Sequence, residues 1–147
     1  MILTIRPLQN SACAFKNYLT QELTTKIKLK EEDQLCFEFR LWLTQKTLQN
    51  AFPFVWFHVA NEIIPNKNFI FGKKLKKIGK MAGVADYIFL GEKGSFAIEF
   101  KSKKGILSPS QKIFKSWCEK NHIPFFCAYT LKDAQEFVLK MVEKFKI

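Results

Sequence analysis

The sequence is poor in the features that mark secreted, zinc-binding or membrane-spanning proteins. Its four cysteines contain no Cys-x-x-Cys pair and its two histidines lie far from them, so we expect neither a structural zinc site nor a disulfide framework. We expect the cysteines to act as small buried hydrophobic residues. No run approaches the roughly 18–20 apolar residues of a membrane span. The first residues lack the positive region and cleavage site of a signal peptide, so the expected location is intracellular.

Acidic residues are also scarce. Thirteen Asp and Glu face 24 Lys and Arg, which gives a formal net charge of +11. Such an excess on a small domain favours a polyanionic partner, which is nucleic acid or, less often, an anionic membrane surface. A lysine-rich proteome is the alternative explanation. With nucleic acid as the partner, we expect the cytoplasm and nucleoid, or the host cytoplasm if the chain is phage-encoded, and no membrane association.

Apolar and aromatic residues are abundant. They make up 48% of the 147 residues and include 16 Phe, which is enough for a sizeable core in one domain. Patterning predicts a mixed α/β domain with a central sheet flanked by helices. The predicted helices are 31–49, 108–121 and 131–145, with a short helical piece at 72–80, and the predicted strands are 54–60, 86–90, 96–101 and 124–129. Residues 1–30, with a helix expected at 11–25, form an extension that is either a dimer arm or a capping helix.

A tight GEKG connection between two predicted strands carries the main chemical signal. If Glu92 and Lys93 form a two-residue loop, Asp86 lies directly opposite Glu99, with Cβ atoms about 4.5–5.5 Å apart. Two carboxylates at that spacing repel each other unless a cation neutralises them, and oxygen ligands suit Mg²⁺ or Mn²⁺. Lys101 shares the face of Glu99 because it lies two residues along the strand. Such a site suits hydrolysis of a phosphodiester.

Charged trios on strands are also common as solvated faces or salt bridges. Two features favour a catalytic site here. Asp86 and Glu99 lie within otherwise apolar strands, where an unpaired charge is costly. Lysines also flank the site on both sides, in an acid-free stretch from Ile63 to Ala85 and again after Lys101. These lysines are the expected phosphate contacts, namely Lys67, Lys73, Lys74, Lys76, Lys77, Lys80, Lys103 and Lys104.

The same residues resemble a known family. The series is Glu31, Asn61, Gly83-Val84-Ala85-Asp86, Ile98-Glu99-Phe100-Lys101 and Leu107-Ser108-Pro109-Ser110-Gln111. It is similar to the VRR-NUC branch of the PD-(D/E)XK nucleases, over about residues 31–145. One departure is Ala85, which stands where the family usually has a proline that shapes the backbone and binds no metal.

The resemblance implies a restriction-endonuclease-like αβββαβα core in residues 31–147. It implies that Asp86 and Glu99 bind the metal together with the Phe100 backbone carbonyl, and that Lys101 is the catalytic lysine. Glu31, or Glu32 after a one-residue shift, corresponds to the acidic residue that approaches the metal. Gln111 corresponds to the glutamine that faces the site, and it can also close a capping box with Ser108.

Three functions follow as hypotheses. The first is a Mg²⁺- or Mn²⁺-dependent DNA endonuclease, a hydrolase acting on duplex, branched or four-way-junction DNA, in some relatives as a homodimer. The second is a non-catalytic nucleic-acid-binding module with a nuclease-like fold. The third is a structural subunit of a larger complex.

Overall fold

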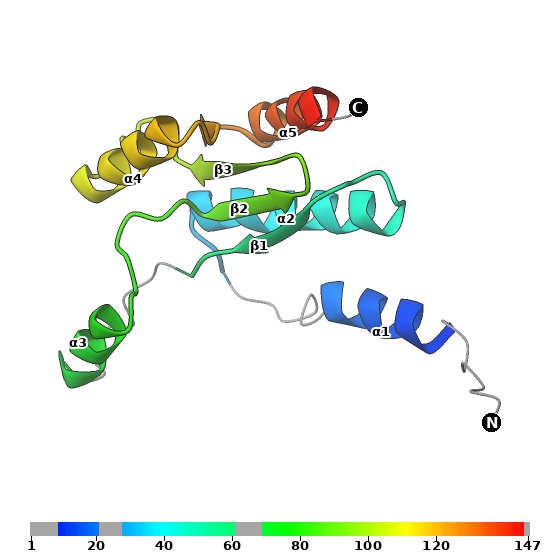
Figure 1. Cartoon of the computed structure of the whole chain (residues 1–147), viewed down its shortest axis with the longest axis horizontal. Helices are drawn as coiled ribbons and strands as arrows, with labels where there is room; N and C mark the ends of the chain where they lie inside the picture. Colours follow the sequence, from blue (N-terminus) through cyan, green and yellow to red (C-terminus); the bar gives the residue numbers. More distant parts are fainter. Residues whose placement is uncertain (1–8, 21–27, 61–68, 146–147) are drawn as a thin grey trace.

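The structure is a computed structural model that describes residues 9–20, 28–60 and 69–145. Within these ranges the chain forms five helices and a four-stranded sheet (Figure 1). The elements are α1 (Gln9–Leu19), α2 (Glu31–Leu48), β1 (Val55–His58), α3 (Phe69–Lys77), β2 (Tyr87–Gly91), β3 (Gly94–Phe100), α4 (Pro109–Lys120), β4 (Phe125–Ala128) and α5 (Leu131–Phe145).

The sheet is mixed and its strands follow chain order, β1-β2-β3-β4. The first three strands are antiparallel, whereas β4 lies parallel to β3 after the crossover through α4. Gly91 pairs with Gly94 across the tight turn, as predicted for the two-residue loop. The register of β2 and β3 is therefore the one that the GEKG sequence indicates.

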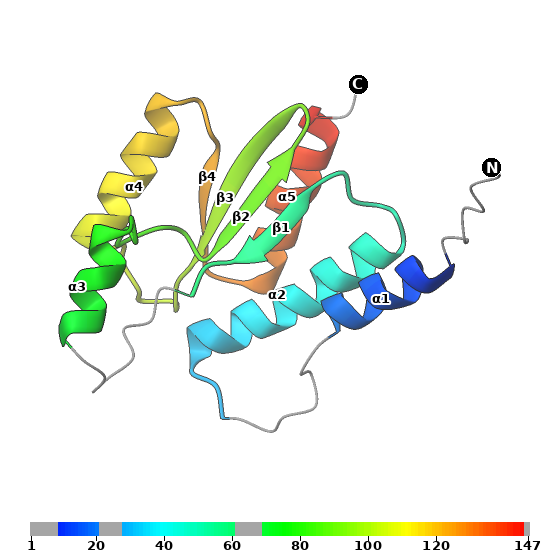
Figure 2. The same ribbon diagram turned by 60° about the horizontal axis from the view of Figure 1, so that its bottom comes forward.

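Helices cover both faces of the sheet. Figure 2 shows α4 on one side of the strands and α5 on the other. The core lies on the side of α2 and α5, where Phe39 of α2 contacts the rings of Tyr87 and Phe100 with centroids 5.1 and 5.2 Å apart. Because side chains alternate along a strand, Tyr87 and Phe89 face this core while Ile88 and Leu90 face the side of α4.

The predicted α/β architecture is confirmed, with differences at its margins. The helix predicted at 131–145 is observed with those bounds, and the others differ by a few residues because their ends are set by backbone hydrogen bonds. The four cysteines are free, but Cys13 is exposed on α1 and so differs from the buried position we expected. No helix in the described part of the chain is long and apolar enough to cross a bilayer.

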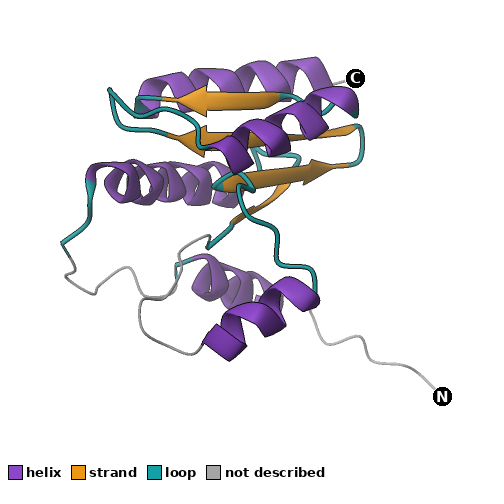
Figure 3. Ribbon diagram, turned by 90° about the vertical axis from the view of Figure 1, so that its left-hand side faces the viewer, coloured by secondary structure: helices purple, strands orange, loops and turns teal. Residues whose placement is uncertain are grey.

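Two helices lie outside the layered core. Figure 3 shows α1 and α3 below the sheet, set apart from the other helices. The last turn of α1 places Tyr18 and Leu19 at a cavity of about 680 Å³ that Trp56 and His58 of β1 also line. Of the extension predicted for residues 1–30, positions 1–8 and 21–27 lie outside the described residues.

Candidate active site

The hairpin of β2 and β3 brings Asp86 and Glu99 together on the face covered by α4. The observed register ends at the Tyr87–Ile98 pair, and one further step of the same register would bring Asp86 opposite Glu99. The Phe100 backbone N–H donates a hydrogen bond of 2.8 Å to Asp86 Oδ2, which holds this carboxylate against β3. The Val59 N–H also bonds to the Asp86 carbonyl at 2.8 Å and fixes its backbone. Both strands neighbouring Asp86 therefore position it.

Glu99 is the most buried charged residue of the site, with 1% of its surface exposed. Its Oε1 accepts hydrogen bonds from Lys101 Nζ at 2.7 Å and from Gln111 Nε2. Its Oε2 is buried and has no hydrogen-bond partner among the described residues. Burial, and then the nearby Asp86 carboxylate, raise the pKa of Glu99 to about 7, although Lys101 opposes the shift. A bound cation would favour the ionised form of Glu99 and so counteract both effects on its pKa.

Burial also raises the pKa of Asp86 above its ordinary value. The hydrogen bond from Phe100 and the charges of His58 and Lys101 oppose that shift. His58 therefore has an electrostatic influence on the site, although the sequence assigned it no role. The two carboxylates are thus both in surroundings where a positive charge is favourable.

Lys101 follows the last residue of β3, and its amine lies between the carboxylates of Glu99 and Glu32. It is 9% exposed, and its Nζ lies 3.9 Å from Glu32 Oε2 in addition to its short contact with Glu99. Burial acts to lower the pKa of Lys101, but Glu99, Glu32 and Asp86 together raise it. The amine is therefore positively charged at neutral pH and held beside the carboxylate pair.

The acidic residue that α2 brings to the site is Glu32. Its Oε1 accepts a 3.0 Å hydrogen bond from the Ser102 N–H, whereas Glu31 is exposed at the first helical position. The structure therefore places Glu32, and not Glu31, beside Lys101. Helical periodicity carries the signal for this assignment, because Glu32 shares a face with the buried Phe39 and Leu43, and Glu31 does not.

Gln111 has both roles expected of it. Its Oε1 accepts from the Ser108 N–H at 2.8 Å and its N–H donates to Ser108 Oγ at 3.2 Å, which closes the capping box at the start of α4. The cap fixes the side chain so that its amide group donates to Glu99. The N-terminus of α4 is thus attached to the carboxylate site by one side chain.

Gly83 lies directly against the first turn of α4. Its φ is +79°, and a Cβ at this position would overlap the backbone of Ser110 and Gln111. Only glycine combines this conformation with such a close approach. The segment that enters Asp86 is therefore packed against the first turn of α4.

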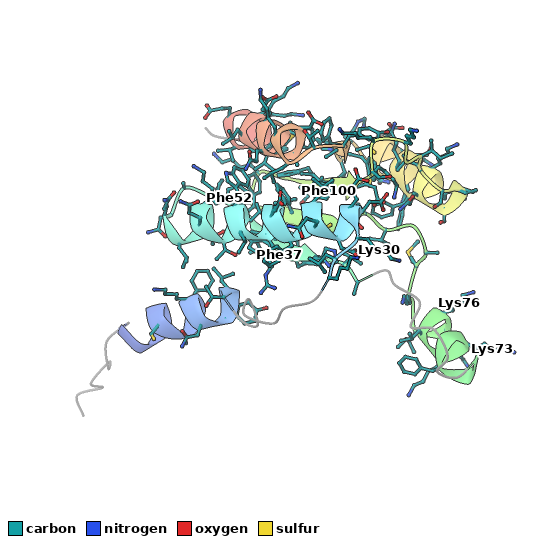
Figure 4. The ribbon with its side chains drawn as sticks, turned by 180° about the vertical axis from the view of Figure 1, so that it is seen from behind. Lys30, Phe37, Phe52, Lys73, Lys76 and Phe100 are labelled. Carbon is teal, nitrogen blue, oxygen red and sulfur yellow. The ribbon has the colours of Figure 1, made fainter. Side chains whose placement is uncertain are left out.

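The predicted lysine contacts fall into two groups on the surface. Four of them, Lys73, Lys74, Lys76 and Lys77, belong to α3 and are exposed, as is the following Lys80. Figure 4 shows Lys73 and Lys76 on this separate helix, apart from the sheet that carries Phe100. Lys103 and Lys104 are exposed in the turn after Lys101. Lys67 and Asn61 lie outside the described residues.

The oxygen donors of the site fit a hard divalent cation. Among the described residues there is no group of three or more His, Cys, Asp or Glu side chains arranged to hold a metal. Mg²⁺ does not need such a group, because it commonly keeps several waters and binds one or two carboxylates. Asp86 and Glu99, whose Oε2 has no partner among the described residues, are the side chains that could hold such an ion.

Comparison of the chain with models of protein families, with curated proteins and with solved structures gave no match. We therefore infer the function from the residues and geometry described above.

Proposed function

We propose that the protein is a metal-dependent endonuclease that hydrolyses phosphodiester bonds in DNA. The observation that supports this most directly is the buried Glu99, paired with Asp86 across two strands, with one carboxylate oxygen unpartnered and a lysine amine 2.7 Å from the other. A carboxylate so placed costs folding free energy unless a cation or a proton neutralises it. The arrangement is more readily explained by metal-dependent chemistry than by stability of the fold.

The residues have separate roles in this proposal. Asp86, Glu99 and the Phe100 carbonyl would hold Mg²⁺ or Mn²⁺, and the bound ion would polarise a phosphoryl oxygen and lower the pKa of water. Lys101 orients the attacking water and stabilises the negative charge that develops on the phosphate. The water oxygen bonds to phosphorus and gives up a proton to the solvent, one phosphorus–oxygen ester bond breaks, and the leaving oxygen takes up a proton from the solvent. Gln111 and Glu32 position Glu99 and Lys101 respectively.

We also propose a family and a substrate for the protein. The αβββαβα order of α2, β1–β3, α4, β4 and α5 is compatible with a restriction-endonuclease-like core, into which α3 is inserted. With the D…ExK and L-S-P-x-Q motifs, it supports a VRR-NUC-like nuclease acting on duplex or branched DNA. The net charge of +11 and the lysines around the site favour this polyanion. A symmetric pair of cuts in a four-way junction would require a homodimer with two sites.

One observation favours a second function, a non-catalytic nucleic-acid-binding module. Lys101 already forms an ion pair with Glu99 at 2.7 Å and thereby neutralises part of the site without a metal. In that case the carboxylate pair and the lysine are a structural ion pair on a nuclease-like fold, and the basic surface alone is functional.

A cleavage panel distinguishes the two functions. The purified full-length chain is incubated with Mg²⁺ or Mn²⁺ and with linear, flapped and four-way-junction DNA. We expect cleavage by the native protein and none by Glu99→Ala, because the variant lacks a metal ligand. Its DNA affinity should stay within about twofold, because the phosphate contacts are made by lysines elsewhere. Lys101→Ala should reduce cleavage by about a hundredfold or more.

Glu92→Ala is the matched control, since Glu92 is an exposed acid in the turn at the opposite end of the same hairpin. It should cut DNA like the native protein. Cleavage that survives Glu99→Ala or Lys101→Ala would contradict the assignment of the site. Salt-dependent DNA binding without cleavage in either metal would favour the non-catalytic module.

A further inference from the structure

Helix α3 has two chemically distinct surfaces. Phe71, Leu75 and Ile78 recur at spacings of four and three residues and therefore lie along one side of the helix and its C-terminal end. After the first two residues of the helix, Lys73, Lys76 and Lys77 lie on the opposite arc and Lys74 borders the stripe, as helical geometry requires. The helix thus presents a narrow apolar stripe beside a broad basic surface.

The apolar stripe of α3 is not covered by the rest of the described chain. Phe71 and Ile78 are 48% and 69% exposed, and Leu75 is half-buried. Figure 1 shows the helix set apart from the sheet and from α4. A nine-residue helix with Gly72 in its interior is only marginally stable in water, because helices of this length depend on packing. These features are expected of a segment whose apolar side is covered by a binding partner.

The chain tethers α3 close to the carboxylate site. Gly83 is packed against Ser110 and Gln111 at the start of α4, and Gln111 contacts Glu99. Gly83 lies five positions after Ile78, and an extended chain of five residues spans at most about 18 Å. A DNA strand held at the site would therefore come within reach of α3.

The loop on the other side of the site repeats the same combination. Ile106 is 81% exposed and follows the exposed Lys103 and Lys104, shortly after Lys101. Both chain segments that border the site thus carry uncovered apolar side chains next to lysines.

The chemistry of the partner follows from this combination. The outside of a DNA duplex offers phosphates to lysines but few apolar surfaces, because its bases are stacked and paired. Unpaired bases present apolar faces on which aromatic and aliphatic side chains pack, beside the same phosphates. We propose that α3 is a binding surface for unpaired bases adjacent to the cleavage site, with Phe71 and Ile78 contacting the bases and the lysines contacting the phosphates.

This inference rests on the proposed function, since it names the part of a DNA substrate that α3 recognises. It makes a strand with unpaired bases beside a duplex, as in a flap or fork, a better ligand than a continuous duplex. Lysines alone would bind both DNAs with affinities set by the DNA charge. A preference for the flapped DNA therefore measures the contribution of the apolar stripe.

The test measures fluorescence anisotropy of the full-length protein with a labelled duplex and with the same duplex carrying a single-stranded flap, in EDTA to prevent cleavage. We expect the native protein to prefer the flapped DNA, and Phe71→Ala/Ile78→Ala to lose about fivefold or more of its affinity for that DNA. Its affinity for the plain duplex and the salt dependence should not change. Lys74→Ala/Lys77→Ala should instead weaken binding to both DNAs and reduce the salt dependence.

The matched control is Leu41→Ala/Leu139→Ala, which removes two leucines that are 40% and 49% exposed on α2 and α5. It should retain the native preference. A fluorescent adenine analogue in the flap should report a change in base stacking with the native protein and none with Phe71→Ala/Ile78→Ala.

Three results would overturn the inference. One is an unchanged flap preference in Phe71→Ala/Ile78→Ala, which leaves the proposed function standing if the DNA is still cut in Mg²⁺. The second is that the stripe binds something other than bases. In that case Phe71→Ala/Ile78→Ala would abolish binding to anionic phospholipid vesicles, or self-association measured by light scattering, while the preference for flapped DNA persists. The third is that no DNA binds at all, which would reject the proposed function as well.

Discussion

A glutamate buried near the end of a β-strand depends on its neighbours for stability. Glu99 obtains hydrogen bonds from Lys101 and Gln111 on one oxygen and none on the other among the described residues. Its apolar strand neighbours, Ile98 and Phe100, are fully buried in the core on the opposite face. The side chain is thus fixed in place by the sheet while its charge is only partly compensated.

The raised pKa of Glu99 predicts an unusual pH dependence of stability in the metal-free protein. The folded protein keeps a proton on Glu99 up to about pH 7, whereas the unfolded chain releases it near its ordinary value of 4.5. The folded state therefore binds more protons in this window, and the free energy of unfolding falls as the pH rises through it, by at most about 3 kcal/mol. Asp86, whose pKa is also raised, acts in the same direction.

Urea unfolding in EDTA across this pH range measures the effect. Glu99→Gln removes the titrating group, so its stability should fall less steeply with pH than that of the native protein. Added Mg²⁺ should restore stability on the alkaline side of the window, because the cation favours the ionised carboxylate. An identical slope in Glu99→Gln would contradict the raised pKa.

Glu32 and Glu31 provide a test of a single helical position. Glu32→Ala removes the acceptor of the Ser102 N–H and a neighbour of Lys101, and we expect it to lower the free energy of unfolding by about 1–2 kcal/mol. Cleavage should fall as well, since the Lys101 amine loses an anchor. Glu31→Ala should change stability by less than about 0.5 kcal/mol, as at other exposed positions. Equal effects of the two substitutions would argue against the assignment of Glu32.

The first turn of α4 makes a close backbone contact with the segment before β2. Gly83 allows the chain before β2 to lie against the first turn of the helix, and the helix in turn carries Gln111 to Glu99. The capping box of Ser108 starts the helix, but it does not determine where the helix lies relative to the sheet. That position comes from the close backbone contact.

Gly83→Ala tests the contact between these elements. The added Cβ would overlap the Ser110 backbone at a φ of +79°, so we expect a loss of at least about 2 kcal/mol in the free energy of unfolding, with reduced cleavage. Gly79→Ala is the control, because Gly79 also has a positive φ, of +102°, but no atom within 4 Å of the added Cβ. Similar losses in both variants would show that strain alone, without the contact to α4, explains the effect.

Viewed as a whole, the molecule is an aromatic core with its charged site on the opposite face of one sheet. Phe89 and Phe96 stack across β2 and β3 with centroids 4.3 Å apart, and Phe39 of α2 packs against this layer. The site faces α4, where the sheet is less completely covered, with Leu90 47% exposed. The core thus provides rigidity for strands whose other face holds ionised groups.

Phe39→Ala should be severely destabilising for this reason. Phe39 is fully buried and contacts rings from both β2 and β3, so its truncation leaves a cavity at the centre of the core. We expect a loss of about 3–5 kcal/mol, measured by urea unfolding. Leu41→Ala, on the exposed side of the same helix, should lose less than about 1 kcal/mol. A small effect of Phe39→Ala would mean that the core tolerates or refills the cavity.

The order of the elements and the register of the central hairpin were decided by local sequence. A two-residue turn between Gly91 and Gly94 leaves one way of pairing the strands that keeps the aromatic side chains on one face. The opposition of Asp86 and Glu99 follows from that pairing, and the start of α4 at Pro109 follows from the capping residues around it. These features depend on interactions between residues close in the chain, so they can be predicted without knowing the rest of the fold.

Contacts between distant segments were decided only by the tertiary structure. Gly83 places the start of α4 so that Gln111 reaches Glu99, and burial leaves Glu99 Oε2 without a partner among the described residues. The separation of α3, which leaves its apolar stripe uncovered, also belongs to this level. Each depends on the relative position of elements far apart in sequence, which is set by the combined packing of the core and cannot be derived from any local pattern.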